Sequence, residues 1–447
     1  MIDIFKQKYR RANKHIFVLA LPSMIALIAE PLLGLVDTAL VGNLGTIELG
    51  ALAIITTFLS GIIWMFNFFV SGTTANIAQL FGQNNVDGMK KFFLQSLTLG
   101  WMIGVGLALM GYVIKPFVFQ IMGASKEIIE IGNLYYLIRL IGFPFIFTYF
   151  ISMGFLRGVQ DMKTPMKITI IANLGNAIAD YVLIYGIPGV MEGFGLIGAA
   201  IATVSVQILS AFWYLVVIYK KYRISIDLFS TEWFDLVLFK KLIVVNQHLF
   251  FRTLFLLSSF MVATAIAARM GEPVLAAHQI GMQLWLFCSF ALDSFAIAGQ
   301  AITGKFIGQK LPGIVHQYSK LLISWNLLLG LFFGFVFLVS GDLIFNVFTN
   351  DHQVLVQLNK IFWFIVLFQP FNGIIFALDG IFIGTLDTKF LMVQLFIASV
   401  LVYIPISLIS LHSNTGITGI WIGLTLFLLI RLVMNLYRFH SKKYLSI

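Results

Sequence analysis

Two carboxylates, Glu30 and Asp37, interrupt an apolar stretch near the start of the sequence. Seven residues make about two helical turns, so both side chains would share one helix face, about 10 Å apart. Farther along, Asn173, Asn176 and Asp180 follow at i, i+3 and i+7, which also places them on one face. A carboxylate withdrawn from water, with a second carboxylate nearby, can bind and release a proton near neutral pH. These residues predict reversible binding of a proton or a cation, above all at Asp37 and Asp180.

Other polar side chains in apolar stretches have a plainer interpretation. Thr203 and Asn173 could equally form ordinary hydrogen bonds between helices. In the second half of the chain, Arg252 could pair with Asp293 or Asp379, because a single charge buried in lipid is costly. We expect a structural ion pair there, and contact with a substrate or ion is the alternative.

Sequence motifs give no support to an enzyme. Residues 299–305 read Gly-x-x-x-x-Gly-Lys, but Phe306 stands where a phosphate-binding loop needs Ser or Thr to bind magnesium. The run also ends an apolar stretch, so we do not predict an ATPase. Cys288 is the only cysteine, which excludes a disulfide within this chain and makes a cysteine metal site implausible. We therefore expect no cofactor and no metal other than a coupling Na+ at Asp37, Asn176 and Asp180.

The elements that position these residues are membrane-spanning helices. Of the 447 residues, 60% are hydrophobic and 11% are charged, against about 25% charged residues in soluble proteins. A membrane-spanning helix needs about 20 apolar residues, and it must be helical because lipid offers the backbone no hydrogen bonds. The sequence predicts twelve such spans, near residues 16–40, 51–74, 92–114, 134–156, 167–187, 195–219, 242–267, 275–303, 319–340, 361–384, 391–411 and 416–437.

The net charge of +10 predicts an orientation and not a nucleic-acid partner. The two termini and the even-numbered loops hold most of the 29 Lys and Arg residues. Because basic residues stay on the cytoplasmic side, both termini should be cytoplasmic, in a prokaryotic inner membrane. Arg139 and Arg252 are the two basic residues that this reading places within spans. The outer loops hold only Lys115, Lys126, Arg269 and Lys360.

An internal repeat divides the chain into two halves. A shift of 226 residues superposes several glycines, a phenylalanine, a proline and two charged residues of the first half on the second, and the offset falls to 221 after one outer loop. The matched positions are Gly45/Gly271, Gly82/Gly308, Phe119/Phe345, Pro144/Pro370, Gly154/Gly380, Gly158/Gly384, Asp161/Asp387, Lys163/Lys389, Gly195/Gly416 and Gly198/Gly419.

The repeat predicts an N-terminal lobe over residues 1–218, a cytoplasmic linker over 219–241 and a C-terminal lobe over 242–447. Each half holds six predicted spans, so the repeats are parallel and related by an axis along the membrane normal. Two such lobes around a central cleft would give access to each side of the membrane in turn. The predicted fold class is therefore an all-α integral membrane protein with two six-helix lobes.

The polar cluster does not follow the repeat. Asp37, Asn176 and Asp180 correspond to Ala263, Val402 and Ile406. We therefore expect the ion-coupling site in the N-terminal lobe alone. Pro22 removes a helical hydrogen bond and could bend the first helix, although prolines are also simply tolerated in membrane helices.

Several motifs resemble one transporter family. Residues 35–45, Leu-Val-Asp-Thr-Ala-Leu-Val-Gly-Asn-Leu-Gly, resemble the first-helix signature of the multidrug and toxic compound extrusion (MATE) family. Ala29-Glu30-Pro31-Leu32, Arg252-Thr253 and Ala276-Ala277-His278-Gln279-Ile280 look like its DinF branch. Gly154-Phe155-Leu156-Arg157-Gly158 and Gly195 to Thr203 also fit, so the resemblance covers essentially the whole chain.

The resemblance implies a V-shaped pair of lobes and export driven by a proton or sodium gradient. On the same resemblance, Asp37, Asn176, Asp180 and Thr203 match the coupling site, Tyr135 lies nearby, and Pro22 marks the first-helix bend. The other branch of the family uses a glutamate in the seventh span, where this sequence has Arg252 and no carboxylate.

The expected function is antiport of amphipathic, cationic compounds against protons, with Na+ as the other candidate coupling ion. We expect a monomer in the lipid bilayer, with small amphipathic cations as its substrates. A flippase for a lipid-linked precursor, or an exporter of an endogenous metabolite, is the alternative. Flippases of that kind carry clusters of basic residues in their cleft, whereas only Arg139 and Arg252 are expected within these spans.

Overall fold

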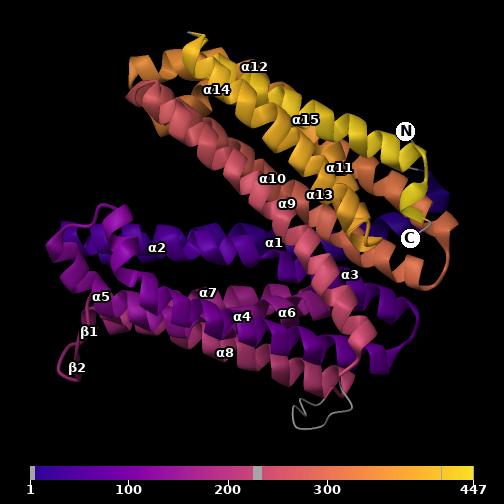
Figure 1. The fold of residues 1–447 in the computed structure, drawn as a ribbon, viewed down its shortest axis with the longest axis horizontal. Coiled ribbons are helices and arrows are strands. Elements are labelled where there is room, and N and C mark those ends of the chain that lie inside the picture. Colours follow the sequence, from indigo (N-terminus) through magenta and orange to yellow (C-terminus); the bar gives the residue numbers. More distant parts are fainter. Residues whose placement is uncertain (1–5, 225–233, 414, 446–447) are drawn as a thin grey trace. The chain divides into compact units, whose positions relative to one another are not determined.

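The computed structural model describes residues 6–224, 234–413 and 415–445, and within these ranges the chain is almost entirely helical (Figure 1). Within these ranges, the structure does not describe the side chains of Glu30, Leu32, Leu33 and Asp342. The first half begins with a short 3-10 helix, Gln7–Tyr9, and ends after the eighth α-helix. Its α-helices are α1 (Arg10–Gly42), α2 (Thr46–Phe66), α3 (Phe68–Gly82), α4 (Val86–Ile121), α5 (Lys126–Ile141), α6 (Phe143–Gly158), α7 (Lys163–Tyr185) and α8 (Leu196–Tyr222).

The second half repeats this pattern with differences in where the helices break: α10 and α12 are continuous, whereas the helix that corresponds to α7 is divided. A π-helical turn, η3 (Ile397–Tyr403), joins α13 to α14, and a 3-10 turn, η4 (Lys443–Leu445), follows the last helix. Its α-helices are α9 (Leu236–Arg269), α10 (Glu272–Gly308), α11 (Pro312–Phe348), α12 (His352–Gly384), α13 (Thr388–Phe396), α14 (Ile404–His412) and α15 (Gly416–His440).

One connection between helices contains a β-hairpin. Strands β1 (Gly186–Ile187) and β2 (Met191–Glu192) pair antiparallel between α7 and α8. The connection that corresponds to it in the second half, between α14 and α15, is much shorter. The hairpin therefore lies where the repeat offset falls from 226 to 221.

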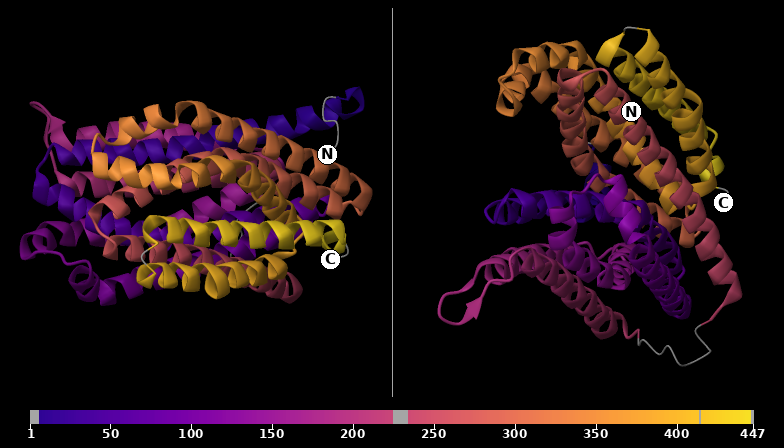
Figure 2. Two further views of the ribbon diagram at one scale, coloured as in Figure 1. Left: turned by 90° about the horizontal axis from the view of Figure 1, so that it is seen from above. Right: turned by 60° about the vertical axis from the view of Figure 1, so that its left-hand side comes forward.

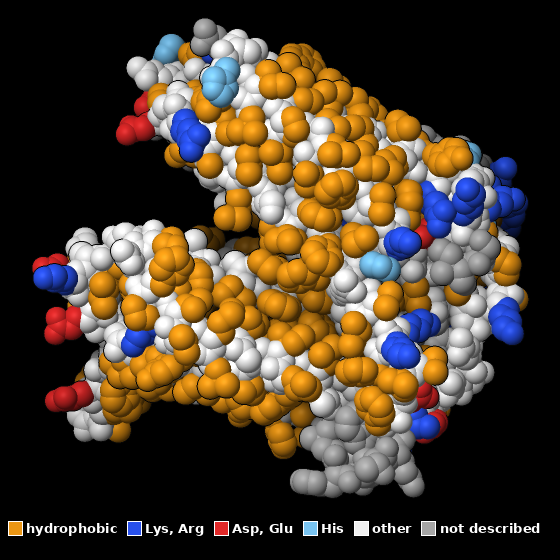
Figure 3. Space-filling view, in the orientation of Figure 1, with side chains coloured by type: hydrophobic (Ala, Val, Ile, Leu, Met, Phe, Trp, Pro, Cys, Tyr) orange, Lys and Arg blue, Asp and Glu red, His pale blue; other side chains and the backbone are white. Residues whose placement is uncertain are grey.

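The helices are long and apolar enough to cross a membrane. Among the described residues, eleven candidate spans stand alone, and Lys126–Ile141 with Phe143–Gly158 forms a further span that is bent by 41°. All twelve predicted spans therefore coincide with helices, and the all-α membrane fold is confirmed. On the face drawn in Figure 3, apolar side chains cover the middle of the helices and charged side chains lie near helix ends.

The chain divides into two compact units, and within each unit the helices run close to parallel (Figure 2). Unit 2 comprises Ile25–Ile77 and Asn85–Leu242. Unit 1 comprises Ile243–Ile447 together with Met1–Met24 and Ala78–Asn84. The division thus differs from the predicted lobe boundaries in these two N-terminal segments.

Side-chain contacts explain why the first segment packs with the second half. The ring of Phe17 makes edge contacts with Phe295 and Trp325, at centroid distances of 5.6 and 4.7 Å. The indole Nε1 of Trp325 also donates a hydrogen bond of 3.1 Å to the Asn13 side chain. The start of α1 therefore shares an apolar core with α10 and α11, while the rest of α1 belongs to unit 2.

At several glycines two helices approach closely, and some of these contacts have a counterpart 226 residues away. A Cβ atom on Gly104 would lie 2.7 Å from the Cα of Pro144, and one on Gly330 would lie 2.9 Å from the Cα of Pro370. Small residues at such contacts let membrane helices approach closely. The same correspondence holds at three further contacts: Gly154 with Val70 and Gly380 with Ala296, Gly158 with Ile77 and Gly384 with Thr303, and Gly82 with Lys305 and Gly308 with Gln79.

The two halves differ at the repeated proline. Pro144 lies in the first turn of α6, directly after the bend at Gly142, whereas Pro370 lies inside the continuous helix α12. The position that corresponds to Gly142 is Phe368, whose buried ring stacks on Trp421 at an interplanar angle of 8°. Packing of Phe368 therefore supports a continuous helix where glycine in the first half permits a bend.

Candidate functional site

The structure brings Asp37 of α1 and Asp180 of α7 together. The two carboxyl groups lie within hydrogen-bonding reach of each other. Asp180 is 1% exposed, and Asp37 is partly buried. The Oδ1 atom of each carboxyl is buried and accepts no hydrogen bond from an N–H or hydroxyl group of the described residues. Each of these oxygens could accept a proton or coordinate a small cation.

Amide side chains on α7 fix the geometry of this pair. Asn176 Nδ2 donates a hydrogen bond of 2.6 Å to Asp180 Oδ2, one helical turn away. Asn173 Nδ2 donates to the backbone oxygen of Ala29 in α1 at 2.9 Å. Asn173 therefore joins the two helices, as the hydrogen-bonding interpretation expects, and Asn176 contacts a carboxylate directly.

Helix α5 adds a tyrosine and an arginine. Tyr135 is 1% exposed, and its hydroxyl accepts a hydrogen bond of 3.2 Å from Arg139 Nη1. The Arg139 guanidinium lies 5.8 Å from the centre of the Tyr135 ring and acts electrostatically on both Asp37 and Asp180. Arg139 also lies in the last turn of α5, where the helix carbonyls favour a positive charge.

Arg139 is the residue of this cluster to which the sequence assigned no role. Its position four residues after Tyr135 places both on one face of a helix, and that spacing is the signal that could have identified it. A positive charge beside two carboxylates leaves the group of Asp37, Asp180 and Arg139 with a formal charge of −1 when all three are ionised. The group as described is therefore suited to bind one further positive charge.

Two predicted residues are not joined to this cluster by the described contacts. Thr203 Oγ1 donates to the Ala199 oxygen of its own helix at 2.9 Å, and none of the hydrogen bonds of the described residues links it to either aspartate. The side chain of Glu30 lies outside the described residues. Pro22 is part of the continuous helix α1, two residues before the boundary between the units.

In the second half, Asp379 of α12 forms an ion pair with two arginines. Arg252 Nη2 lies 2.7 Å from Asp379 Oδ2, and Arg431 Nη2 contacts the same oxygen. Asn435 Nδ2 donates to Asp379 Oδ1 at 3.1 Å. Of the two predicted partners, Asp379 is thus the one that contacts Arg252 in this ion pair. These contacts occupy both carboxylate oxygens, which favours the structural role.

Arg431 corrects the expectation that Arg139 and Arg252 are the only arginines within spans. It lies in the middle of α15 and is 3% exposed. The predicted span 416–437 includes it, but the sequence reading counted it with the basic C-terminus. Its position inside an apolar stretch was the signal that could have placed it correctly.

Comparison with known proteins identifies the family. The profile of the MatE family matches residues 22–182 and 249–409, one match in each half. DNA damage-inducible protein F of Escherichia coli is 29% identical, over 94% of this chain and 90% of its own length. A probable multidrug resistance protein NorM of Photorhabdus laumondii is 26% identical, over 95% of this chain and 94% of its own.

Solved structures show the same fold. A Vibrio cholerae MATE transporter, VcmN, superposes with a TM-score of 0.87 at 18% identity, covering 99% of this chain and 100% of the other. A transporter of the MOP superfamily from Pyrococcus furiosus superposes with a TM-score of 0.84 at 21% identity, covering 97% and 96%. The chain therefore belongs to the MATE family of multidrug and toxic compound efflux transporters, and it is a membrane transporter and not an enzyme.

Proposed function

We propose that this transporter exports amphipathic, cationic compounds in exchange for protons, and that Asp37 and Asp180 hold the coupling proton. One observation carries the proposal: a buried carboxyl group on α7, Asp180, and a partly buried one on α1, Asp37, lie within hydrogen-bonding reach. Two carboxylates at such a distance share a proton more readily than either would bind one alone.

Competition for negative charge provides the coupling. When the proton is present, the two carboxyl groups share it, and it cancels the formal charge of −1 that remains beside Arg139. When the proton leaves, the carboxylates repel each other and can attract a cationic substrate instead. Proton and substrate therefore exclude each other, which is the requirement for antiport. Repulsion between α1 and α7 would also act on the bend proposed at Pro22.

The coupling ion is proposed to be H+ in preference to Na+. Hard cations bind oxygen ligands, so a Na+ ion at Asp37, Asn176 and Asp180 would need the amide oxygen of Asn176. In the structure, the nitrogen Nδ2 of Asn176 faces Asp180. This orientation supports a site that binds a proton. Thr203 remains a proposed member of the site.

The proposed setting follows from the basic residues. The termini and even-numbered loops carry most of the Lys and Arg, which supports a prokaryotic inner membrane with both termini in the cytoplasm. The repeat supports alternating access by two lobes, residues 1–218 and 242–447, within one monomer.

Efflux of ethidium, a fluorescent cation, from proteoliposomes tests the proposal. Wild-type protein should respond to an imposed pH gradient, and Asp37→Asn and Asp180→Asn should each abolish that response. Asp87→Asn is a matched control, because its carboxylate is 70% exposed and pairs with Lys91 on the surface. Efflux driven by a sodium gradient alone would show that Na+ and not H+ is the coupling ion. Efflux by Asp37→Asn at the wild-type rate would refute the proposed proton site.

A second candidate function is transfer of a lipid-linked precursor across the membrane. The observation that favours it is Arg431, which is a third arginine, after Arg139 and Arg252, within the spans predicted from the sequence. Arg252 and Arg431 both contact Asp379, however, which leaves less positive charge for an anionic headgroup. Movement of a labelled lipid between leaflets of the same proteoliposomes, without ethidium efflux, would support this function over the first.

A further inference from the structure

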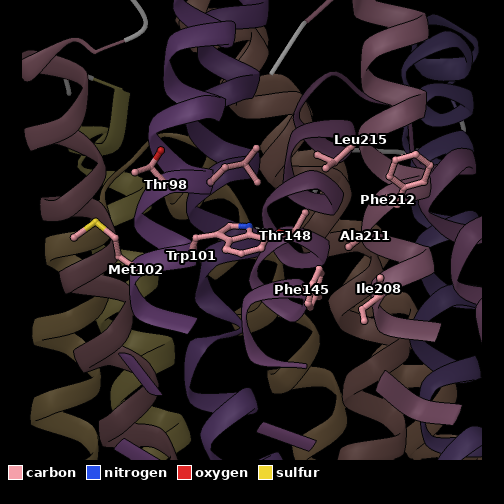
Figure 4. Close-up of a pocket in the computed structure, with 10 residues that line it drawn as sticks. Thr98, Trp101, Met102, Phe145, Thr148, Ile208, Ala211, Phe212 and Leu215 are labelled. Atoms are coloured by element: carbon pink, nitrogen blue, oxygen red, sulfur yellow. Dashed lines mark hydrogen bonds between the residues drawn. The ribbon is translucent and has the colours of Figure 1, made fainter. Parts of the chain in front are cut away.

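Helices α4, α6 and α8 of unit 2 enclose a groove of about 550 Å³ that the proposed transport site does not use. Its size falls within the range of about 300–1,000 Å³ typical of small-molecule pockets. Figure 4 shows Trp101 of α4 beside Thr148 of α6, with Ala211 and Phe212 of α8 across from them. The rings of Trp101 and Phe145 meet edge to face at 5.5 Å. These aromatic side chains form a rigid apolar wall.

The polar atoms of the groove are satisfied by the protein itself. The indole Nε1 of Trp101 donates to Thr148 Oγ1 at 3.0 Å. Thr148 Oγ1 donates in turn to the Pro144 oxygen at 3.1 Å, and Thr98 Oγ1 donates to the Leu94 oxygen at 3.0 Å. None of the residues that line the groove is charged. A cationic drug or a lipid headgroup would therefore find no ionic partner here, whereas a hydrocarbon chain needs none.

The groove is continuous with an apolar surface that faces outward from unit 2. Trp101, Val105 and Leu109 are exposed at i, i+4 and i+8 of α4, so they form one stripe, and Trp101 is also part of the groove wall. Helices α4 and α8 each qualify as a membrane span, and α6 completes a bent span with α5. An exposed apolar stripe on a membrane span meets the acyl chains of the bilayer.

We propose that this groove binds one acyl chain of a membrane lipid. The chain enters from the bilayer past Met102 and Phe212, which are 67% and 66% exposed, and it packs against Trp101 and Ala211. Because Phe145 lies in the first turn of α6, the bound chain also covers the segment that follows the bend at Gly142. The inference is independent of the proposed proton site.

Photocrosslinking in detergent micelles tests this proposal, because no bilayer lipid is present there to compete with the probe. The full-length protein in a maltoside detergent is titrated with phosphatidylcholine that carries a diazirine on one acyl chain, and labelled peptides are identified by mass spectrometry. Labelling of the groove residues on α4 and α8 should saturate as the probe fraction rises. Labelling near Leu109 and Val113, which are exposed on α4 outside the groove, should rise in proportion to the probe.

A groove-filling variant provides the second arm. Ala211 is 2% exposed and lines the groove, whereas Leu209 is 65% exposed on the same helix and does not. Ala211→Trp should lower the groove labelling about tenfold or more because the indole occupies the space of the chain, and Leu209→Trp should leave it unchanged. If Ala211→Trp fails to fold, the wild-type saturation curve decides alone.

Three results would overturn the proposal. The first is groove labelling in wild type that rises linearly with the probe, as on any lipid-facing surface. The second is labelling in folded Ala211→Trp equal to that in Leu209→Trp. The third is loss of groove labelling when ethidium is added, which would make the groove a site for a cationic substrate and not for a lipid.

Discussion

At the scale of single residues, Asp37 and Asp180 depend on what surrounds them. Loss of water raises the free energy of an ionised carboxylate, and a second carboxylate nearby raises it further by repulsion. Arg139 opposes both effects because it supplies a positive charge from a third helix. The sequence identified the carboxylates because they interrupt apolar runs. Spacing along the chain could not identify their pairing, because contact between α1 and α7 depends on packing, and only the resemblance to the MATE family placed both carboxylates in one site.

Arg139→Gln tests the role of this positive charge. Without the guanidinium, the unprotonated pair loses its compensating charge, so we expect proton-driven ethidium efflux to fall about tenfold or more. Arg139→Lys keeps a positive charge and should retain most of the activity, although it loses the planar contact with the Tyr135 ring. Equal rates for Arg139→Gln and Arg139→Lys would show that charge at this position is irrelevant to coupling.

Asp161 gives a pH-dependent prediction outside the spans. Burial tends to raise the pKa of this carboxyl, but hydrogen bonds from Lys221 and Thr164 outweigh that effect and lower the pKa below its ordinary value. A lowered pKa in the folded state contributes stability above the ordinary carboxyl pKa of about 3.9, and that stability is lost as the pH falls through the lowered value.

We therefore expect Asp161→Asn to lower the thermal unfolding temperature at neutral pH, by an amount that corresponds to about 1–3 kcal/mol. The difference from wild type should stay constant down to about pH 5 and shrink below it. Lys221→Met, which removes a half-exposed partner, should cost less, about 1 kcal/mol or below. A difference that grows on acidification would contradict this account of Asp161.

At the scale of elements, close glycine contacts determine how the helices pack. Gly104 lets α4 approach the backbone of α6 at Pro144, and the repeat places Gly330 and Pro370 in the same relation between α11 and α12. The sequence located all the spans, because the length of an apolar run is a strong signal. It did not predict the bend at Gly142, because glycine and proline are both common in straight membrane helices.

Gly104→Ala should therefore destabilise the protein. A Cβ atom at this position would lie 2.7 Å from the Cα of Pro144, so α4 and α6 must separate, at a cost of about 1–3 kcal/mol. Gly106→Ala is the matched control on the same helix, because its Cβ would meet nothing within 4 Å. Thermal unfolding in detergent, followed by size-exclusion chromatography, should show a lower midpoint for Gly104→Ala alone. A lower midpoint for both variants would point to a general effect on α4.

At the scale of the whole molecule, the repeat indicates a duplicated membrane protein, and the charged residues indicate that its two halves have diverged. The family profile matches once in each half, and the glycine contacts recur at the same offset. Among the described residues, the carboxyl pair belongs to the first half, and the buried Arg252–Asp379–Arg431 group belongs to the second. The sequence predicted this asymmetry for the carboxylates. It could not decide between Asp293 and Asp379 for Arg252, since both lie within spans.

Cysteine labelling in intact cells tests the predicted orientation. In a Cys288→Ala background, Ser413→Cys lies between α14 and α15 and should react with a membrane-impermeant maleimide added outside. Ser441→Cys, just after α15, should react only after the membrane is permeabilised. Both serines are exposed, so a difference in reactivity reports the side of the membrane. Labelling of Ser441→Cys in intact cells would place the C-terminus outside and invert the topology.

The contact of Asp379 with two arginines also constrains how the chain is made. The ribosome delivers α9, α12 and α15 in that order, so Arg252 and Asp379 can neutralise each other before Arg431 is synthesised. A nascent chain that stops before α15 retains a balanced pair, because Arg431 is then missing together with its charge. A chain that lacks α12 brings two arginines into the membrane without their carboxylate, which is costly for each. Cellular quality control should therefore tolerate loss of the last helix better than loss of α12.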